Sequence, residues 1–446
     1  MAAGSMLARL ALDSREKRAW AMYDWANSAF WTTIIGAVFP EYYARALAPE
    51  SGAGSEGRYA LATTIALLII AFLAPFLGTL ADFRAVKKKF LGTFAIGGAL
   101  AAACMFFVHP GEWLFGLILF GVANIGASGS VIFYDALLPH VADEDEVDRL
   151  STSGFALGYV GGGFLLALNF LWITQPQWFG LPSGDGLSAE ESSLPVRLAF
   201  LSVGVWWFLF SLPVLLRVPE PPGDEGAKVE AGGLIATTLS RLSTTFNELK
   251  RYRQAFRLLL AFLVYNDGIL TIVRMAVLYA KSKDLGPQVV MGTFLLVQFV
   301  GIPFTFLFGQ LAGRFGTKFL ILTGLTTYCG ITVLAFFMET ATHFVMLGIL
   351  VAMVQGGTQA LSRSLFSSMI PRRKSGEFFA FFSVGEKFAG IFGPLLYAGM
   401  IYWTGSNQNA ILSVAVFFVI GAWLLVRVDV AEGQGKIRAE EAAQST

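Results

Sequence analysis

Long apolar segments separated by short polar connections dominate the pattern of this chain. A membrane-spanning helix needs about 20 mostly apolar residues, and twelve segments meet that requirement. We expect spans near 20–44, 59–81, 90–108, 113–138, 152–174, 196–217, 256–281, 288–312, 318–338, 342–366, 376–403 and 408–427. The apolar runs are too long, and alternate too little, for a transmembrane β-barrel. The pattern predicts an all-α integral membrane protein with 12 transmembrane helices.

Lysine and arginine positions predict the orientation of these spans. Most of the 32 basic residues fall in the N-terminus, the even-numbered loops and the C-terminal tail. Loops on the cytoplasmic side of a membrane are enriched in Lys and Arg, so we expect both termini in the cytoplasm. The polar stretch 218–255 divides the spans six and six. Its composition is typical of a flexible linker followed by an amphipathic helix at the membrane surface.

These features predict five regions. We expect a cytoplasmic N-terminus at 1–19, a six-helix half at 20–217, the cytoplasmic linker at 218–255, a second six-helix half at 256–428 and a cytoplasmic tail at 429–446. Because each half has an even number of spans, the halves should be parallel, as in a known plan of transporters.

Composition and charge exclude several other classes of protein. Hydrophobic residues make up 55% of the chain and charged residues only 14%, against roughly 25% charged residues in ordinary soluble domains. The net charge of +1 provides no basic field for nucleic acid. No HExxH pattern or P-loop occurs, so no metal or other cofactor is expected. No nucleophile, base and orienting group lie near one another in the sequence, which argues against an enzyme.

An internal repeat relates the two halves. Gly78-Thr-Leu-Ala-Asp82 ends the second span, and Gly309-Gln-Leu-Ala-Gly313 ends the eighth. Nearly the same offset relates Asn124 to Gln355, Ser128 to Gln359 and Gly158 to Gly390. Recurrence at several separate places is typical of a duplicated unit rather than of chance in an apolar chain.

With these motifs, the sequence resembles the major facilitator superfamily. The superfamily's signature after span two is Gly-x-Leu-Ala-Asp followed by basic residues, although Phe83 stands here where a basic residue is common. The second copy has Gly313 in place of the acid. The resemblance implies a cytoplasmic latch between helices, and the alternative is a simple positively charged stop. The candidate latch residues are Gly78, Asp82, Arg84, Lys87, Gly309, Arg314, Gly316 and Lys318.

Five further stretches are similar to the vacuole-effluxer-like branch of that superfamily, which includes autophagy-linked vacuolar amino-acid effluxers. They are Tyr23-Asp-Trp-Ala-Asn-Ser28, Phe133-Tyr-Asp-Ala-Leu-Leu-Pro139, Gly158-Tyr-Val-Gly-Gly-Gly163, Gln359-Ala-Leu-Ser-Arg-Ser364 and Lys387-Phe-Ala-Gly-Ile-Phe-Gly-Pro394. The resemblance implies a solute effluxer, with amino acids as the favoured substrates. Such families are functionally broad, so the substrate stays open.

Polar residues within the spans are costly in a membrane and usually face a bundle interior or a wet cavity. Spans three, six, nine and twelve contain no charged residue away from their ends. In the other spans, polar residues recur at helical spacing and share one face. The candidate cavity residues are Tyr23, Asp24, Asn27, Trp31, Asn124, Ser128, Asp135, Asn266, Asp267, Thr271, Arg274, Gln355, Gln359, Arg363, Glu386 and Lys387.

Each of these residues has a structural alternative. Asp24 and Asp135 could lie at the interface as helix-end residues, and Arg363 could extend toward phosphate headgroups. Asp267 and Arg274 could form a purely structural ion pair. Glu386 and Lys387 could have structural partners on other helices, and Tyr23 and Trp31 could serve packing alone. The glycine-rich run Gly161-Gly-Gly163 indicates close helix packing rather than nucleotide binding, since no strand precedes it.

The in-span charges suggest a mechanism. The first half carries only acids, whereas the second half also carries Arg274, Arg363 and Lys387. We hypothesise that Asp24 or Asp135 pairs with Arg363 when the cytoplasmic mouth closes, and that alternating access breaks the pair. Carboxylates without a permanent partner are compatible with proton coupling, with Asp267, Glu386 or Asp24 as carriers.

The sequence therefore predicts a secondary transporter of a small polar or zwitterionic solute. Amino acids are favoured, efflux is the expected direction, and sugars or short peptides are alternatives. A lipid scramblase on the same scaffold and a non-transporting sensor are further alternatives. The N-terminus lacks the apolar run of a signal peptide. We therefore expect a monomer in the plasma (inner) membrane, with the solute and the bilayer as its partners.

Overall fold

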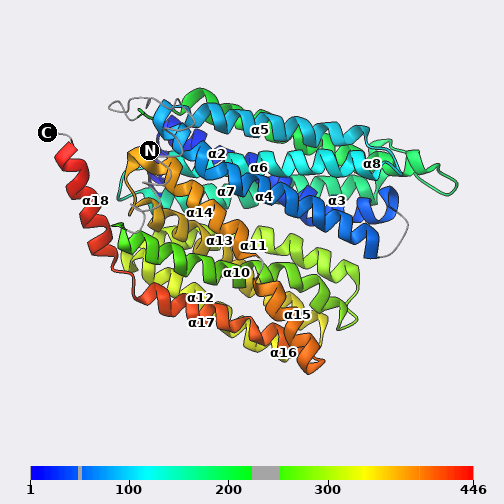
Figure 1. The fold of residues 1–446 in the computed structure, drawn as a ribbon. Helices are drawn as coiled ribbons and strands as arrows, with labels where there is room; N and C mark the ends of the chain where they lie inside the picture. Colours follow the sequence, from blue (N-terminus) through cyan, green and yellow to red (C-terminus); the bar gives the residue numbers. More distant parts are fainter. Residues whose placement is uncertain (1, 49–52, 224–250, 391, 445–446) are drawn as a thin grey trace.

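The computed structural model describes residues 2–48, 53–223, 251–390 and 392–444, and within these ranges every regular element is a helix. Figure 1 shows two bundles of roughly parallel helices, one formed by the chain up to α8 and the other by the chain from α10 onward. Both termini lie at the same end of the molecule, which we call the termini end (Figure 1). This is the placement expected for an even number of crossings.

The first bundle contains the elements up to residue 217. They are α1 (Ala2–Arg9), α2 (Arg15–Ala29), a π-helix (Phe30–Val38), α3 (Phe39–Tyr42), a second π-helix (Tyr43–Leu47), α4 (Ala53–Arg84), α5 (Lys87–Cys104), α6 (Trp113–Val141), α7 (Val147–Thr174) and α8 (Ala189–Arg217), with 3-10 turns at Met105–Phe107 and Pro176–Phe179.

The second bundle contains the elements from residue 253. They are α10 (Arg253–Lys281), α11 (Pro287–Phe315), α12 (Thr317–Phe336), α13 (Ala341–Ser367), a 3-10 turn (Arg372–Lys374), α14 (Ser375–Ala389), α15 (Phe392–Thr404), α16 (Asn407–Ser413), α17 (Ala415–Val426) and α18 (Val430–Gln444).

Among the described residues, ten helices are long and apolar enough to cross a membrane. The expected span 20–44 is helical throughout but alternates between α and π geometry, and the expected span 376–403 is divided between α14 and α15, so neither is one regular α-helix. Most of the polar linker, with its expected amphipathic helix, lies outside the described residues.

Proline and glycine account for the two interruptions. Pro40 has no N–H and its ring crowds the carbonyl four residues earlier, and it is the second residue of α3, which follows the wider π-helix Phe30–Val38. In the second case the chain breaks between α14 and α15, where Gly390 and Gly393 flank the break. Pro394 lies in the first turn of α15, where a missing N–H costs nothing.

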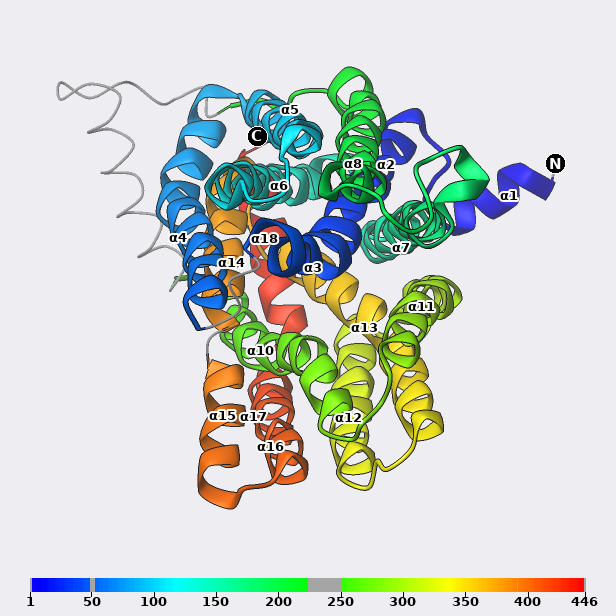
Figure 2. The same ribbon diagram turned by 90° about the vertical axis from the view of Figure 1, so that its right-hand side faces the viewer.

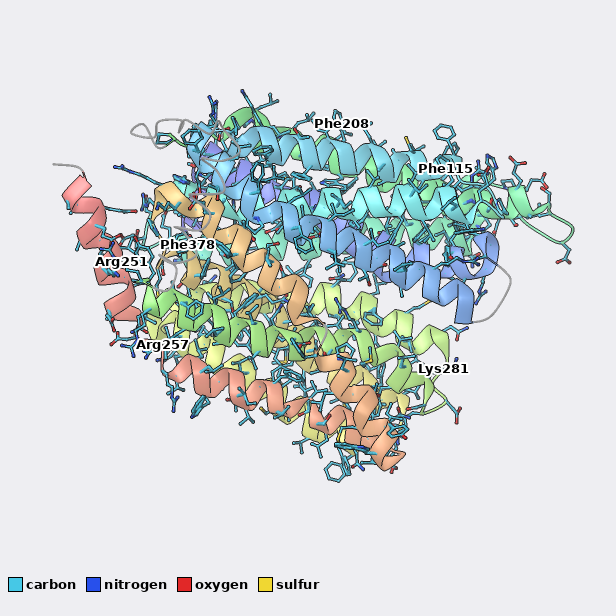
Figure 3. All side chains as sticks on the ribbon, viewed as in Figure 1. Phe115, Phe208, Arg251, Arg257, Lys281 and Phe378 are labelled. Atoms are coloured by element: carbon cyan, nitrogen blue, oxygen red, sulfur yellow. The ribbon has the colours of Figure 1, made fainter. Side chains whose placement is uncertain are left out.

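The outer surface of the bundle suits a bilayer. Phe115 and Phe208 lie on the outer face of the first bundle, with exposed fractions of 44% and 38% (Figure 3). Arg251 and Arg257 lie at the termini end, whereas Lys281 lies at the opposite end (Figure 3). The cytoplasmic location of the termini end stays a prediction from the distribution of basic residues.

Candidate functional site

An arginine from the second bundle reaches two carboxylates of the first bundle near the termini end. Arg363 on α13 places its Nη1 3.0 Å from an oxygen of Asp135 on α6, and its Nη2 3.4 Å from an oxygen of Asp24 on α2. The side chain of Arg363 is only 5% exposed. Its Nε and Nη2 also donate to the hydroxyl and the carbonyl of Ser151 on α7, both at 2.9 Å. We call Asp24, Asp135, Ser151 and Arg363 the arginine network.

Aromatic residues surround the arginine network. The Tyr134 hydroxyl donates to Asp24 at 2.8 Å, and Trp20 donates to the Tyr134 carbonyl while their rings stack at 4.3 Å. The guanidinium carbon of Arg363 lies 4.5 Å from the centre of the Phe155 ring. These contacts exclude water and hold the carboxylate of Asp24 in place, which strengthens the charge interactions of the network.

In this arrangement, three of the predicted charged residues contact other helices. Asp135 is buried on α6 and faces another helix rather than an interface. Arg363 points into the protein, not toward lipid headgroups. Asp24 is 19% exposed and contacts both Tyr134 and Arg363. The sequence predicts that Asp24 or Asp135 pairs with Arg363 across the halves, and in the structure Arg363 contacts both acids. Their role in transport stays a prediction.

A second contact between the bundles involves Asp82, the acid of the signature motif at the end of α4. Its oxygens accept hydrogen bonds from the backbone N–H groups of Gly376 (3.1 Å) and Glu377 (2.7 Å) in the first turn of α14. The same carboxylate pairs with Lys87 at 2.6 Å, and both side chains are buried. Asp82 therefore satisfies the otherwise unpaired start of a helix in the other bundle, where the helix dipole favours a negative charge.

Glycines allow the helices of the two bundles to approach closely at this contact and at a second one between α7 and α11. A Cβ atom on Gly78 would lie 2.5 Å from the Gly376 carbonyl oxygen, and a Cβ on Gly309 would lie 1.9 Å from the Thr152 hydroxyl. Figure 2 shows the two seams that result, with α4 beside α14 and α7 beside α11. The first glycine of each repeat copy thus lies at a seam between the bundles.

The second copy of the motif lacks the acid. At that seam, an acid on α7 of the first bundle makes the hydrogen bonds to the second bundle. Asp148, in the first turn of α7, accepts hydrogen bonds from Thr317 at the start of α12 and from Ser364 on α13. Lys318 donates to the carbonyls of Val426 and Val428 at the end of α17. The two seams are therefore built from related parts, but the carboxylate lies on α4 in one and on α7 in the other.

The other latch candidates have local roles. Arg84 is exposed and stacks against the ring of the adjacent Phe83, and Arg314 does the same with Phe315. Gly316 adopts a φ of 88°, a left-handed conformation that glycine accommodates without strain, and so allows the turn between α11 and α12. These residues contribute charge or turn geometry rather than contacts across the bundles.

The predicted polar faces of spans one and four are present on their helices. The Asn27 carbonyl oxygen accepts from Trp31 at 2.6 Å, while its amide contacts the buried Tyr23 hydroxyl at 3.5 Å. Ser128 donates to Asn124 at 3.4 Å, and both are buried in α6. These pairs make the interior of the first bundle polar along two helices that lead to the arginine network.

The interior of the second bundle differs from the expectation for Asp267 and Arg274. These two residues form no ion pair. Asp267 instead accepts from the backbone N–H of Gly393 at 3.0 Å, at the start of α15, and from Thr271 at 3.5 Å. Arg274 is exposed and donates to the Gly390 carbonyl at 2.8 Å. Both side chains therefore stabilise the break between α14 and α15, because that break leaves backbone groups without helical partners.

The remaining candidates occupy α10, α13 and α14. Gln359 donates to Asn266 at 3.4 Å, joining α13 to α10 within the second bundle. Gln355 lines a cavity of that bundle. Glu386 is half-buried on α14, and the side chain of Lys387 lies outside the described residues. In the described part of the chain, no hydrogen bond or ion pair joins Asn266, Gln355 or Gln359 to the arginine network.

Sequence reasoning missed four residues that the structure brings to the site. They are Trp20, Tyr134, Asp148 and Ser151. Asp148 and Ser151 are three positions apart on one face of α7, a spacing that could have identified them. Tyr134 and Trp20 carried no such signal, since a buried aromatic residue in an apolar span is ordinarily a packing residue.

All hydrogen bonds and ion pairs that join the two bundles, as far as the described residues show, lie toward the termini end. Besides the arginine network and the Asp82 and Asp148 contacts, they include Ser375 to the Ala136 carbonyl at 2.8 Å and Arg438 to Glu144 at 2.6 Å. The molecule is thus held closed at the termini end.

Comparison with known proteins agrees with this arrangement. Residues 58–438 match the family described as "Vacuole effluxer Atg22 like". The uncharacterized MFS-type transporter YxiO of Bacillus subtilis is 36% identical over 93% of this chain and 95% of its own length. Autophagy-related protein 22-1 of Phaeosphaeria nodorum is 25% identical over 86% of this chain and 78% of its own.

Solved structures support the fold. The MFS proton:xylose symporter XylE superimposes with a TM-score of 0.68 at 16% identity, covering 93% of this chain and 95% of that one. The MFS transporter FucP, solved in the outward conformation, gives 0.67 at 13% identity, with 93% and 98% covered. The relatives are transporters rather than enzymes. This chain therefore belongs to the Atg22-like vacuole effluxer family of the major facilitator superfamily and is a multi-pass membrane transporter.

Proposed function

We propose that this transporter moves a small zwitterionic solute, an amino acid in the favoured case, out of the cytoplasm by proton-coupled alternating access. It acts as a monomer in the plasma (inner) membrane. The observation that carries the proposal is the bridge of Arg363 to both Asp24 and Asp135. This bridge joins the two halves at the end where both termini lie.

A zwitterion suits the arginine network because its two charged groups can compete with both sides of the bridge. A substrate carboxylate can take the place of Asp24 or Asp135 beside Arg363. A substrate ammonium group can then occupy the carboxylates that the arginine leaves. Binding would therefore weaken the contact that holds the bundles together, and its energy would favour opening of the termini end.

The charge balance of the network favours proton coupling. Two carboxylates face one guanidinium, so one negative charge has no cationic partner within the network. Within the described residues, the hydrogen-bond partners of the nearby Asp148 side chain are the hydroxyls of Thr317 and Ser364. A proton on one of these carboxylates removes a charge that is costly to bury, and its release would accompany opening to water. XylE, which shares this fold, is a proton:xylose symporter, so proton coupling has a precedent on this scaffold.

Purified protein in proteoliposomes tests the proposal. We expect uptake or exchange of radiolabelled amino acids, stimulated by an imposed pH gradient, and no comparable movement of sugars or short peptides. A fluorescent-lipid assay on the same vesicles should show no scrambling. Transport of a sugar or peptide alone would contradict the substrate, indifference to the pH gradient would contradict the coupling, and lipid scrambling without solute transport would contradict the function.

The matched control is the exposed ion pair between Glu144 and Arg438. It also joins the two halves, but its side chains are 47% and 61% exposed. Exposed ion pairs contribute roughly 0–1 kcal/mol. The variant Glu144→Gln should therefore transport like the unaltered protein under every condition of the assay.

A further inference from the structure

The second bundle contains a partly open cavity of about 180 Å³ among α10, α11, α12 and α13. Protein interiors are close-packed and hold few voids larger than a water molecule. The cavity is thus far larger than a packing defect and is suited to hold a ligand.

The lining of the cavity is mostly apolar, and it includes two groups of polar side chains. Ile331, Ala335, Met338 and Phe344 belong to its apolar part, which faces away from the termini end. Three polar side chains, Tyr159, Gln298 and Gln355, also line it and lie nearer the middle of the bundle. No Asp, Glu, Lys or Arg is among the described residues that line it.

The polar side chains of this cavity fall into two groups. One group donates its hydroxyl protons to backbone carbonyls of its own bundle, so these protons are not available to a ligand. It consists of Thr293, Thr332 and Tyr279. Within the described chain, no side-chain hydrogen bond engages Tyr159, Gln298 or Gln355. These three residues therefore offer uncommitted donors and acceptors to a hydrogen-bonding group in a mostly apolar space.

Tyr159 connects this cavity to the other half of the protein. It belongs to α7 of the first bundle, yet its ring lies in a notch formed by glycines of the second. A Cβ atom on Gly356 would lie 2.5 Å from the ring, and one on Gly301 would lie 3.3 Å from it. Part of the cavity lining is thus supplied by the first bundle, which moves relative to the second bundle during alternating access.

We infer that the cavity is a binding site for a small uncharged amphiphile, with a ring-sized apolar group and one hydrogen-bonding group. The size fits, since an apolar cavity of about 150 Å³ binds benzene in a well-studied protein core. The missing charges exclude an ionic ligand, which distinguishes this site from the arginine network. Because Tyr159 completes the wall only in the present arrangement of the halves, the ligand stabilises the state closed at the termini end.

Phenol tests this inference as a probe. We expect saturable binding of radiolabelled phenol to the purified protein, measured by equilibrium dialysis. The variant Ala335→Leu fills the apolar part and should weaken binding at least tenfold. Val333→Leu, an exposed site on the same helix, should leave binding unchanged. Binding that is not saturable, or that is equal in the Ala335→Leu variant, would overturn the inference.

A second measurement separates this site from the proposed transport function. Adding phenol should shift the distances between spin labels on the two halves, at the termini end, to the shorter values of the closed state. The Ala335→Leu variant should not show this shift. Neither phenol binding nor this shift to shorter distances requires any solute to be transported. Loss of transport activity with intact phenol binding would therefore count against the proposed function alone, whereas binding without any effect on the distances would contradict the coupling through Tyr159.

Discussion

Exchanging the charges of Asp135 and Arg363 is expected to restore transport that each single reversal abolishes. Asp135→Arg places two guanidinium groups beside each other in a buried site, and Arg363→Asp places a third carboxylate beside two others. The double variant again pairs a cation on α6 with an acid on α13, with Asp24 still close by. The bridge between the halves is thus re-formed with its direction reversed.

The expected effect is large because the network is buried. Removing one partner of a buried ion pair costs roughly 3–5 kcal/mol. Where that energy stabilises only the closed state, the ratio of closed to open molecules falls by a factor on the order of a hundred or more. We expect transport in proteoliposomes to fall by a similar factor in each single variant, and to recover at least tenfold in the double variant.

The exposed pair between Glu144 and Arg438 provides the control for this exchange. Glu144→Arg, Arg438→Glu and their combination should all transport within about twofold of the unaltered protein, since exposed pairs contribute little. Failure of the double exchange at Asp135 and Arg363 to recover any transport, with all variants folded and inserted, would show that the contact is not an interchangeable bridge.

Loss of the Asp82 carboxylate is expected to produce the second large effect. Asp82→Ala leaves Lys87 buried without its anion and leaves the N–H groups of Gly376 and Glu377 at the start of α14 without their acceptor. A buried charge left unpaired costs about 3–5 kcal/mol. We expect a fall in the thermal unfolding temperature of the purified protein, and a marked loss of transport.

A companion substitution distinguishes the two parts of this effect. Adding Lys87→Met to Asp82→Ala removes the unpaired cation, so it should recover most of the lost thermal stability. It should recover little transport, because the contact with α14 stays broken. Lys89→Met, an exposed lysine in the same run, should change neither quantity. Full recovery of transport in the Asp82→Ala, Lys87→Met variant would contradict a latch between the bundles.

The sequence predicted the charged residues of the site because charge is rare in lipid. A chain with few charged residues keeps one inside a span only where a partner offsets the cost of burial. The opposite signs on the two halves then indicated which residues meet, and the structure places Arg363 against Asp24 and Asp135. Glycine at regular positions likewise indicated close packing, and Gly161 does lie against the Trp25 backbone.

Other parts of the site depend on tertiary contacts that leave no pattern in the sequence. Tyr134 and Trp20 act through one hydrogen bond each, and the apolar pattern would be unchanged without those bonds. Asp267 and Arg274 are seven positions apart, a spacing compatible with an ion pair. The break in the helix at Gly390 instead supplied backbone partners for both. A missing backbone partner outweighed the attraction between the two charges.

The measurement that tests the central claim most directly is the distance between the halves at the termini end. Asp145 and Arg373 are exposed positions on the two halves. Spin labels on Asp145→Cys and Arg373→Cys report this distance by pulsed electron paramagnetic resonance once Cys104 and Cys329 are replaced. A label pair within the first half, at Arg84 and Asp145, serves as the control.

If the arginine network holds the termini end closed, Arg363→Gln should shift the distances between the labels at 145 and 373 to larger values. The distances between the labels at 84 and 145 should stay unchanged. Unchanged distances between the halves in the Arg363→Gln variant would contradict the account.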